Sequence, residues 1–286
     1  MAAERGARVA VAEDAAFGGT CVNLGCIPKK LYSFAAHYAE SFDEAHGYGW
    51  AAERPAFDWP KLKANRASER ILVATGGWPV PPEVPGGDLA ISSNEIFDLA
   101  QFPRRLVVVG GGYIACEFAS IFNGLGAKVT QLYRGEQILR GFDDEVRDFV
   151  ANEMRKKGVD MRVGVKVSAL ERGADGIRVL LAGGGELLAD AVLYATGRAP
   201  NSRGLGLESL GVSLAPNGAI EVDEHYRTNV PSIYALGDVI DRVQLTPVAL
   251  AEAMALVDEL FGGTGRRVDY THIPTAVFTH PNIGTI

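Results

Sequence analysis

Two cysteines five residues apart are the side chains in this sequence best suited to covalent chemistry. Cys21 and Cys26 lie in the run GGTCVNLGCIPKK, at the entrance to a stretch from about Pro28 to Glu44 that is expected to be helical. A helix N-terminus and the two lysines of this run both favour the thiolate form of a cysteine. The pair is therefore expected to be redox-active.

Other interpretations of the cysteines are weaker. A metal site would need a second cysteine or histidine pair at suitable spacing, and the sequence has none. Two inert buried thiols fit poorly with the surrounding glycines and lysines. The third cysteine, Cys116, lies on an apolar helical stretch and is interpreted as a small packing residue.

A second chemical signal lies further along the chain. Gly110-x-Gly112-x-x-Ala115 follows the apolar strand expected at 105–109 and opens a helix expected at 113–125. The first glycine permits a tight turn, the second lets the backbone approach a pyrophosphate, and the small third residue lets helix and strand pack closely. We expect a dinucleotide site here; the alternative is a tight turn without a ligand.

The residues after the next strand indicate which dinucleotide binds. An NAD site places a carboxylate at this strand end to bind the ribose 2′-hydroxyl. Here Tyr133 takes that place, Arg134 follows, and Arg140 is near. Guanidinium groups suit a 2′-phosphate, so NADPH is expected. Solvated surface charges are the alternative.

The elements that must position these residues alternate between strand and helix. The end of a helix is expected at 1–6, a strand at 8–13 and a strand in 71–77, and four prolines in 78–87 indicate a linker. Further strands are expected at 128–133, 176–181, 191–194 and 233–235, with a turn at 183–185 and a helix at 247–261. ATGG, ATGR and ALGD each follow an apolar strand, where α/β sheets hold nucleotides.

Composition narrows the class of protein. The chain has 286 residues and 47% hydrophobic residues, enough for about two domains. A net charge of −7 argues against nucleic acid or an anionic membrane as partner. No apolar run reaches the length of a membrane span. Three cysteines in a chain this long fit a reducing compartment, so a cytoplasmic protein is expected.

Several blocks together resemble one family. GGTCVNLGCIPKK resembles the redox-disulfide segment of the glutathione reductase branch of the pyridine nucleotide-disulfide oxidoreductases. GGGYIACEFA, YRGEQILRGFD, ATGRAPN, IYALGDV and LTPVALAE resemble further blocks in the same order. The resemblance implies an α/β fold with two Rossmann-like, three-layer nucleotide-binding domains, incomplete here, and the start of an α+β dimerisation domain. It implies domains at 1–80 (FAD), 81–199 (NADPH), 200–271 (central, returning to the FAD domain) and 272–286 (interface).

The resemblance also implies an activity. NADPH would reduce FAD, FAD would reduce a Cys21–Cys26 disulfide, and the dithiol would reduce glutathione disulfide in a homodimeric enzyme without a metal. Cys26 would lie beside the flavin, and Cys21 would be the interchange thiol that attacks the substrate. Lys29 would pair with Glu117 near the flavin, and Tyr113 would cover the flavin until nicotinamide arrives.

The remaining cofactor contacts follow from the same blocks. Glu13 would bind the FAD ribose, and Thr20, Asp238 and Thr246 would complete the FAD contacts. Gly111, Ile114, Arg134, Arg140 and Gly197 would hold NADPH. Other cofactor-binding positions expected from the resemblance are Gly19, Cys21, Thr75, Gly76, Gly110 and Gly112.

The sequence departs from the family pattern in four places. The family has a glycine-rich FAD turn ahead of the point that matches residue 1, several antiparallel strands at the point where Arg70 is followed by Ile71, and an interface domain with a His–Glu acid–base pair beyond the point that matches Ile286. The sequence contains none of these three segments. His280 is interpreted as structural. Met254 stands where some relatives use an arginine for glutathione. A trypanothione-like substrate, less so dihydrolipoyl, and a non-catalytic nucleotide-binding fragment are therefore the alternatives.

Overall fold

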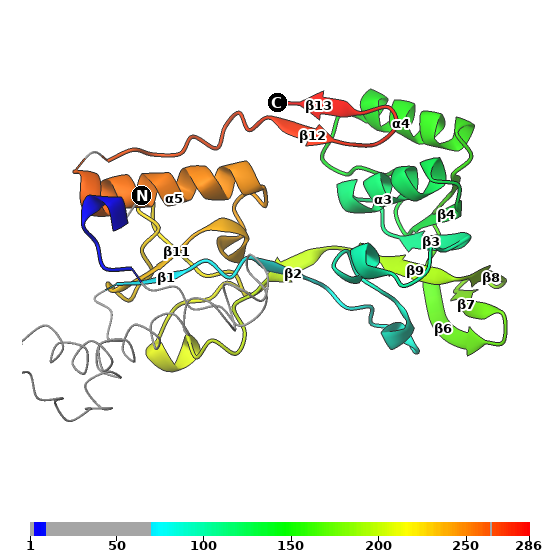
Figure 1. Ribbon diagram of the computed structural model, residues 1–286, viewed down its shortest axis with the longest axis horizontal. Coiled ribbons are helices and arrows are strands. Elements are labelled where there is room, and N and C mark those ends of the chain that lie inside the picture. Colours follow the sequence, from blue (N-terminus) through cyan, green and yellow to red (C-terminus); the bar gives the residue numbers. More distant parts are fainter. Residues whose placement is uncertain (1–2, 10–69, 264) are drawn as a thin grey trace, which may run out of the picture. The chain divides into compact units, whose positions relative to one another are not determined.

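The computed structural model describes residues 3–9, 70–263 and 265–286 (Figure 1). The chain divides into two compact units, each assembled from segments that are far apart in the sequence. The first unit comprises Met1–Thr75, Gly204–Ser213 and Ile220–Arg267, and the second comprises Gly76–Arg203, Leu214–Ala219 and Val268–Ile286. The predicted site residues Glu13, Gly19, Thr20, Cys21, Cys26 and Lys29 lie outside the described residues.

A four-stranded parallel sheet forms the centre of the second unit. Its strand order is β5-β4-β3-β9, and the strands are Asp160–Val163 (β5), Lys128–Tyr133 (β4), Arg105–Val109 (β3) and Ala191–Tyr194 (β9). Three of these were predicted from the sequence and are confirmed. Leu106 is in register with Val129 on one side and Ala191 on the other.

Two helices cover one face of this sheet, and a second sheet covers the other (Figure 1). The helices are α3 (Tyr113–Gly124) and α4 (Asp144–Lys156). The second sheet is antiparallel, with the order β6-β7-β8, and consists of Val167–Gly173, Gly176–Leu181 and Glu186–Ala189. The second unit is therefore a three-layer α/β unit, and its parallel strands are buried on both faces.

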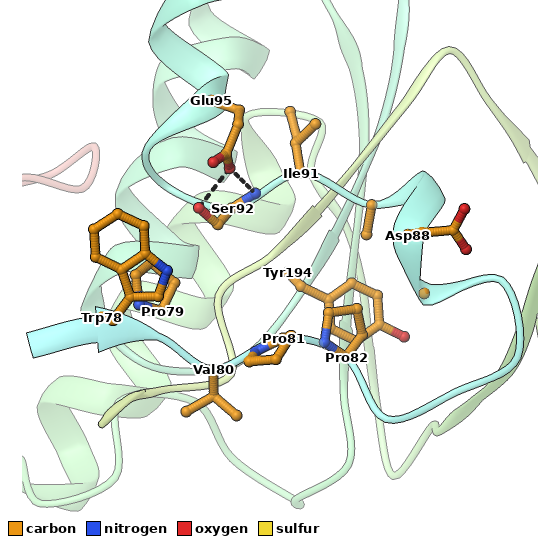
Figure 2. A pocket seen from close by; sticks show the side chains of 12 residues that line it. Trp78, Pro79, Val80, Pro81, Pro82, Asp88, Ile91, Ser92, Glu95 and Tyr194 are labelled. Carbon is orange, nitrogen blue, oxygen red and sulfur yellow. Dashed lines mark hydrogen bonds between the residues drawn. The ribbon is translucent and has the colours of Figure 1, made fainter. Parts of the chain in front are cut away.

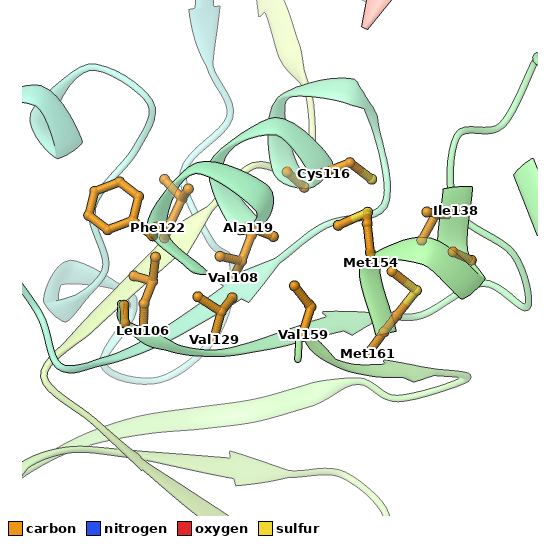
Figure 3. Close-up of a cluster of buried hydrophobic side chains, with 14 of the residues drawn as sticks. Leu106, Val108, Cys116, Ala119, Phe122, Val129, Ile138, Met154, Val159 and Met161 are labelled. Carbon is orange, nitrogen blue, oxygen red and sulfur yellow. The ribbon is translucent and has the colours of Figure 1, made fainter. Parts of the chain in front are cut away.

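The core of the second unit follows from this layering. Leu106, Val108 and Val129 pack beneath the helices with Cys116 and Met154 (Figure 3). Val107, Leu132 and Val192 face the antiparallel sheet instead. Strands buried on both faces have nearly continuous apolar sequences, which explains why β3 and β9 are readable as strands from the sequence alone.

Some elements of this unit were not predicted. Helix α4 begins after Asp143, whose Oδ1 accepts hydrogen bonds from the backbone of Glu145 and Val146 at 3.0 and 3.2 Å. The 183–185 turn was expected to join the strands at 176–181 and 191–194. In the structure it joins β7 to β8, which was not predicted and precedes β9 in the sequence. Helix α3 ends at Gly124, and Gly126 at φ +98° completes its C-terminus, close to the prediction.

The proline-rich run at 78–87, predicted as a linker between domains, begins just after the boundary between the two units and is held at its two ends within the second. Strand β2 (Gly77–Pro79) pairs antiparallel with β10 (Arg198–Pro200). The Pro85 carbonyl accepts a hydrogen bond from Leu170 at 2.8 Å. Short 3₁₀ helices, η4 (Gly87–Leu89) and η5 (Glu95–Asp98), follow. Proline fixes the backbone without excluding edge pairing, so its density alone does not mark a free linker.

The first unit is smaller among the described residues. Strands β1 (Ile71–Val73) and β11 (Ile233–Ala235) pair in parallel, and β11 runs into η7 (Gly237–Ile240). Helix α5 (Thr246–Gly262) is one residue longer at each end than predicted. The helix end expected at 1–6 is a 3₁₀ turn, η1 (Ala3–Arg5), and η6 spans Glu208–Leu210. Most of the strand expected at 8–13 lies outside the described residues.

A hairpin near the end of the chain belongs to the second unit. Strands β12 (Thr275–Val277) and β13 (Ile283–Thr285) pair antiparallel. Within residues 3–9, 70–263 and 265–286, no helix is long and apolar enough to cross a membrane.

Candidate dinucleotide-binding site

The turn between β3 and α3 is built so closely that its first residue must be glycine. The Gly110 amide donates to the Leu132 carbonyl at 2.9 Å, and Gly110 has a φ of +146°. A Cβ at this position would lie 2.3 Å from the carbonyl oxygen of Ala195 and 3.1 Å from the Cβ of Ala115. Residue 110 therefore combines a conformation that favours glycine with a close approach to β9.

Glycine occupies the next two positions, 111 and 112, for different reasons. A Cβ on Gly111 would lie 2.5 Å from the ring of Tyr133, so that aromatic ring occupies the space. Gly112 is exposed, has ordinary extended backbone, and would meet nothing within 4 Å if it carried a Cβ. The fold itself does not need glycine at 112. A ligand that approaches the N-terminus of α3 would need the space that a Cβ at this position would fill. This open cradle fits a pyrophosphate group.

The helix behind the turn carries the small residues that the motif requires. Ala115 and Cys116 are both fully buried. The Cys116 Sγ lies 3.9 Å from the Gly111 carbonyl oxygen, and burial raises the pKa of this thiol to about 12. The predicted packing role of Cys116 is consistent with this burial, because so high a pKa keeps the thiol protonated and unreactive.

Gly197 lies at the same edge of the parallel sheet as the turn. Ala195 follows β9 and donates its amide to Val109, the last residue of β3, at 2.8 Å. Two residues later Gly197 is exposed, with a φ of +145° and open space around it. The carboxyl ends of β3 and β9 thus bring Gly110 and Gly197 to one edge, as expected for a nucleotide site.

The two arginines expected to recognise a 2′-phosphate follow β4, the neighbour of β3. Arg134 and Arg140 are exposed, and neither guanidinium forms an ion pair with another described residue. Their segment is fixed against the turn, because the Leu139 amide donates to the Gly111 carbonyl at 2.6 Å. Two cationic groups without partners here are consistent with an anionic ligand.

Glu117 and Tyr113 share a face of α3, since they are four residues apart. Tyr113 is 39% exposed at the start of the helix. Glu117 Oε1 accepts a hydrogen bond from the backbone amide of Phe278 at 2.8 Å. Its expected partner Lys29 lies outside the described residues, so the pairing stays a prediction.

In the first unit, Thr75 and Asp238 each follow one of two paired parallel strands. Thr75 comes after β1, and Asp238 lies in η7 after β11. The Gly237 amide donates to Glu252 Oε2 at 2.7 Å, and Glu252 is 1% exposed. Thr246 is the exposed first residue of α5. Gly76, in the second unit, has a φ of +71° and open space around it.

Sequence reasoning missed two buried polar residues that hold these turns. Glu252 fixes η7 in the first unit, and Gln131 donates its side-chain amide to the Gly110 carbonyl at 3.1 Å in the second. The available signal was a polar residue in the interior of a strand or helix. Such a residue is costly to bury unless it makes a specific bond.

A separate cleft of about 470 Å³ lies within the second unit (Figure 2). Its wall includes Trp78, Pro82 and Tyr194. Glu95 accepts hydrogen bonds from the backbone and hydroxyl of Ser92 at 2.7 and 2.6 Å, which lowers the pKa of the Glu95 carboxyl. That carboxylate is therefore already used within the fold, and the cleft carries no chemistry of its own. Among the described residues, no cluster of acidic, histidine or cysteine side chains could hold a metal.

Comparison with known proteins identifies the family. Residues 1–253 match the family described as pyridine nucleotide-disulphide oxidoreductase. The chain is 43% identical to a glutathione reductase of Burkholderia cepacia, over all of this chain and 73% of that protein. It is 39% identical to a trypanothione reductase of Trypanosoma congolense, over 95% of this chain and 67% of that protein. The Cu(II) complex of the HOCl-induced flavoprotein disulfide reductase RclA from Escherichia coli aligns with a TM-score of 0.77 and 28% identity, over 99% of this chain and 72% of that chain.

The layered fold and the glycine turn define a nucleotide-binding protein of the Rossmann type. The chain belongs to the pyridine nucleotide-disulphide oxidoreductase family. It is a flavoprotein disulfide reductase with FAD and NADPH as its cofactors. The family and fold inferred from the sequence motifs are confirmed.

Proposed function

We propose that this protein reduces glutathione disulfide with NADPH. The observation that carries the proposal is the turn at Gly110–Gly112, where an open backbone cradle at the N-terminus of α3 is followed by Arg134 and Arg140, both exposed and without an ion pair to any residue that the structure describes. The cradle suits the pyrophosphate, and the arginines suit the 2′-phosphate that distinguishes NADPH from NADH. The similarity to a glutathione reductase supports the substrate.

The chain's own residues have separate tasks in this function. Gly110, Gly111, Gly112, Ile114 and Gly197 hold the dinucleotide, and Tyr113 covers the flavin until the nicotinamide arrives. When bound, FAD supplies the two-electron link between NADPH and the Cys21–Cys26 pair. Glu117 forms an ion pair with Lys29. The FAD contacts come from Glu13, Gly19, Thr20, Cys21, Lys29, Thr75, Gly76, Asp238 and Thr246.

The cysteine pair carries out the exchange with substrate. The Cys21 thiolate attacks one sulfur of the disulfide, which forms a mixed disulfide and releases one thiolate. The Cys26 thiolate then attacks the Cys21 sulfur, which releases the second thiolate and restores the Cys21–Cys26 disulfide. Each released thiolate takes up a proton. Two electrons pass from the dithiol to the substrate, and no other reductant is needed.

The proposal includes the organisation of the chain. Residues 1–80 contribute to the FAD domain, 81–199 form the NADPH domain, 200–271 return to the FAD domain, and 272–286 lead into an interface domain. A cytoplasmic homodimer is the proposed working form.

The first experiment is a visible spectrum of the purified full chain before and after addition of NADPH. Bound flavin that is bleached by NADPH supports the proposal. A colourless protein that still binds NADPH supports the alternative of a nucleotide-binding polypeptide without disulfide reductase activity. Absence of NADPH binding contradicts the proposal.

The second experiment tests the exchange step. A Cys21→Ser variant is expected to lose glutathione disulfide turnover while NADPH still reduces the flavin. Retained turnover would contradict the role of Cys21 as the thiol that attacks the substrate. Assaying trypanothione disulfide beside glutathione disulfide decides the substrate, because the chain also resembles a trypanothione reductase and carries Met254 on α5.

A further inference from the structure

Gln131 is a polar side chain in a place where the fold has no general need for one. It lies in the middle of β4, on the face covered by α3, and is 0% exposed. The neighbouring members of this core, Val129 and Cys116, are also fully buried. A primary amide in such surroundings is unfavourable unless its hydrogen bonds are made. An apolar residue of similar size would fill the space without that cost.

The amide makes its bonds to the nucleotide turn. Gln131 Nε2 donates to the Gly110 carbonyl oxygen at 3.1 Å and to Cys116 Sγ at 3.4 Å. Its Oε1 atom has no hydrogen-bond partner among the described residues. The fold therefore retains a buried amide whose oxygen is unsatisfied. Of the two hydrogen bonds that its nitrogen donates, the one to an oxygen acceptor is to the first residue of the turn, and the one to the Cys116 sulfur is to a weaker acceptor.

That bond fixes the orientation of a peptide plane. In a trans peptide the C=O and the following N–H point in opposite directions. A Gly110 carbonyl held towards Gln131 therefore directs the Gly111 N–H away from the core. The Gly111 carbonyl is held in the same way by the Leu139 amide at 2.6 Å, which orients the Gly112 N–H. Neither N–H has an acceptor among the described residues.

We propose that Gln131 is a positioning residue for the pyrophosphate of the dinucleotide. Its side chain holds the Gly110 carbonyl inward and so fixes the peptides that face the ligand. Glycines have wide conformational freedom, and three in succession need such restraint if their amides are to be preorganised. The proposal rests on the proposed function, since it assumes that a dinucleotide binds at Gly110–Gly112.

The test compares three probes on the full chain by calorimetry: NADPH, 2′-phospho-ADP-ribose, and adenosine 2′-monophosphate, which lacks the pyrophosphate. Gln131→Met keeps the side-chain volume but cannot donate. It is expected to weaken binding of the first two probes by about five- to tenfold, the range for one lost hydrogen bond. Adenosine 2′-monophosphate should bind within about twofold of wild type. The matched control, Leu193→Met, changes an equally buried residue of β9 and should leave all three unchanged.

Equal loss for all three probes, or no loss for any, overturns the positioning role. Wild-type chain that binds none of the probes overturns the proposed function and this role with it. If Gln131→Met does not fold, Gln131→Glu decides the question, because a neutral carboxylic acid can donate to Gly110 and a carboxylate cannot. Because position 131 is fully buried, the pKa of that carboxyl should be raised well above its ordinary value. The affinity of this variant for NADPH relative to wild type should therefore fall as the pH rises from about 6 to about 9; a constant ratio contradicts the proposal.

Discussion

Glu117 on α3 and Phe278 in the segment between β12 and β13 are joined by a hydrogen bond of 2.8 Å, from the Phe278 amide to Glu117 Oε1. The two residues are 161 positions apart in the chain. One carboxylate oxygen is thereby held by backbone, and this restrains a side chain that is proposed to pair with Lys29. The contact separates two roles of Glu117, acceptance of a hydrogen bond and negative charge.

Substitutions at Glu117 should resolve these roles. Glu117→Gln retains an oxygen that can accept from Phe278 but loses the charge, so stability should change little while NADPH reduces the flavin at least about tenfold more slowly. Glu117→Ala should lose a further contribution of about 1 kcal/mol to the free energy of unfolding. Stopped-flow flavin reduction and urea denaturation measure the two effects. Equal flavin reduction in Glu117→Gln and wild type would contradict the proposed ion pair.

The glycines at 111 and 112 should respond in opposite ways to alanine. Gly112→Ala adds a Cβ that meets nothing within 4 Å, so the free energy of unfolding should change by less than about 1 kcal/mol. NADPH binding should nevertheless weaken by about tenfold or more, because the Cβ enters the ligand cradle. Gly111→Ala should instead destabilise the fold by about 1–3 kcal/mol, because its Cβ meets the Tyr133 ring. Thermal unfolding and NADPH titration distinguish these outcomes; unchanged NADPH affinity in Gly112→Ala would show that no phosphate binds there.

Arg134 and Arg140 should determine the choice of nicotinamide cofactor. Replacing either by alanine removes a guanidinium from the proposed 2′-phosphate site, so the KM for NADPH should rise by about tenfold or more. The KM for NADH, which lacks that phosphate, should stay within about twofold. Arg155→Ala on α4 removes the same charge from an exposed position elsewhere and is the control. A parallel rise for NADPH and NADH would contradict recognition of the phosphate.

Cys116 should be inert towards alkylation in the folded protein. Burial raises its pKa to about 12, so at pH 8 only about one molecule in ten thousand carries the thiolate. Iodoacetamide labelling followed by mass spectrometry should modify Cys116 only after denaturation. Rapid labelling of the native chain would contradict the close packing of α3 on the sheet.

His225 should give the first unit a measurable pH dependence. Its Nδ1 lies 2.7 Å from Glu259 on α5, Glu224 lies 3.5 Å from Nε2, and Asp223 adds further negative charge. The hydrogen bond with Glu259, chiefly, raises the pKa of His225. A raised folded-state pKa stabilises the fold below the unfolded-state value, and this contribution is lost as the pH rises through the folded-state value. NMR titration should find a His225 pKa above about 6.5 that falls in Glu259→Gln; an unchanged pKa in that variant would exclude the pairing.

The sequence was a sufficient guide wherever burial or backbone geometry dictates residue type. Strands β3, β4 and β9 are largely apolar because both faces of the sheet are covered, and the small residues Gly110 and Ala115 reflect a close contact between the turn and helix α3. Helix α4 was missed although Val146, Val150 and Met154 recur at helical spacing in its sequence, DEVRDFVANEMRK. Its Asp143 cap was a second available signal.

The parts that could not be predicted depend on contacts between distant segments. The pairing of β2 with β10 and the bond from Phe278 to Glu117 join residues separated by more than a hundred positions. Gln131 was missed because its role depends on a contact with the Gly110 carbonyl, 21 positions away. Periodicity along the chain carries no information about such a partner.

The ring of Tyr133 constrains which variants of this turn natural selection can reach. A Cβ at Gly111 or at Gly135 would lie about as close to that ring, at 2.5 and 2.6 Å. Replacing either glycine is therefore costly while residue 133 is tyrosine, whereas residue 133 can become smaller while both glycines remain. The order of substitutions at these three positions therefore matters. Once residue 133 is smaller, residues 111 and 135 can both acquire side chains. After either of them has done so, a return to tyrosine at 133 would produce a steric clash.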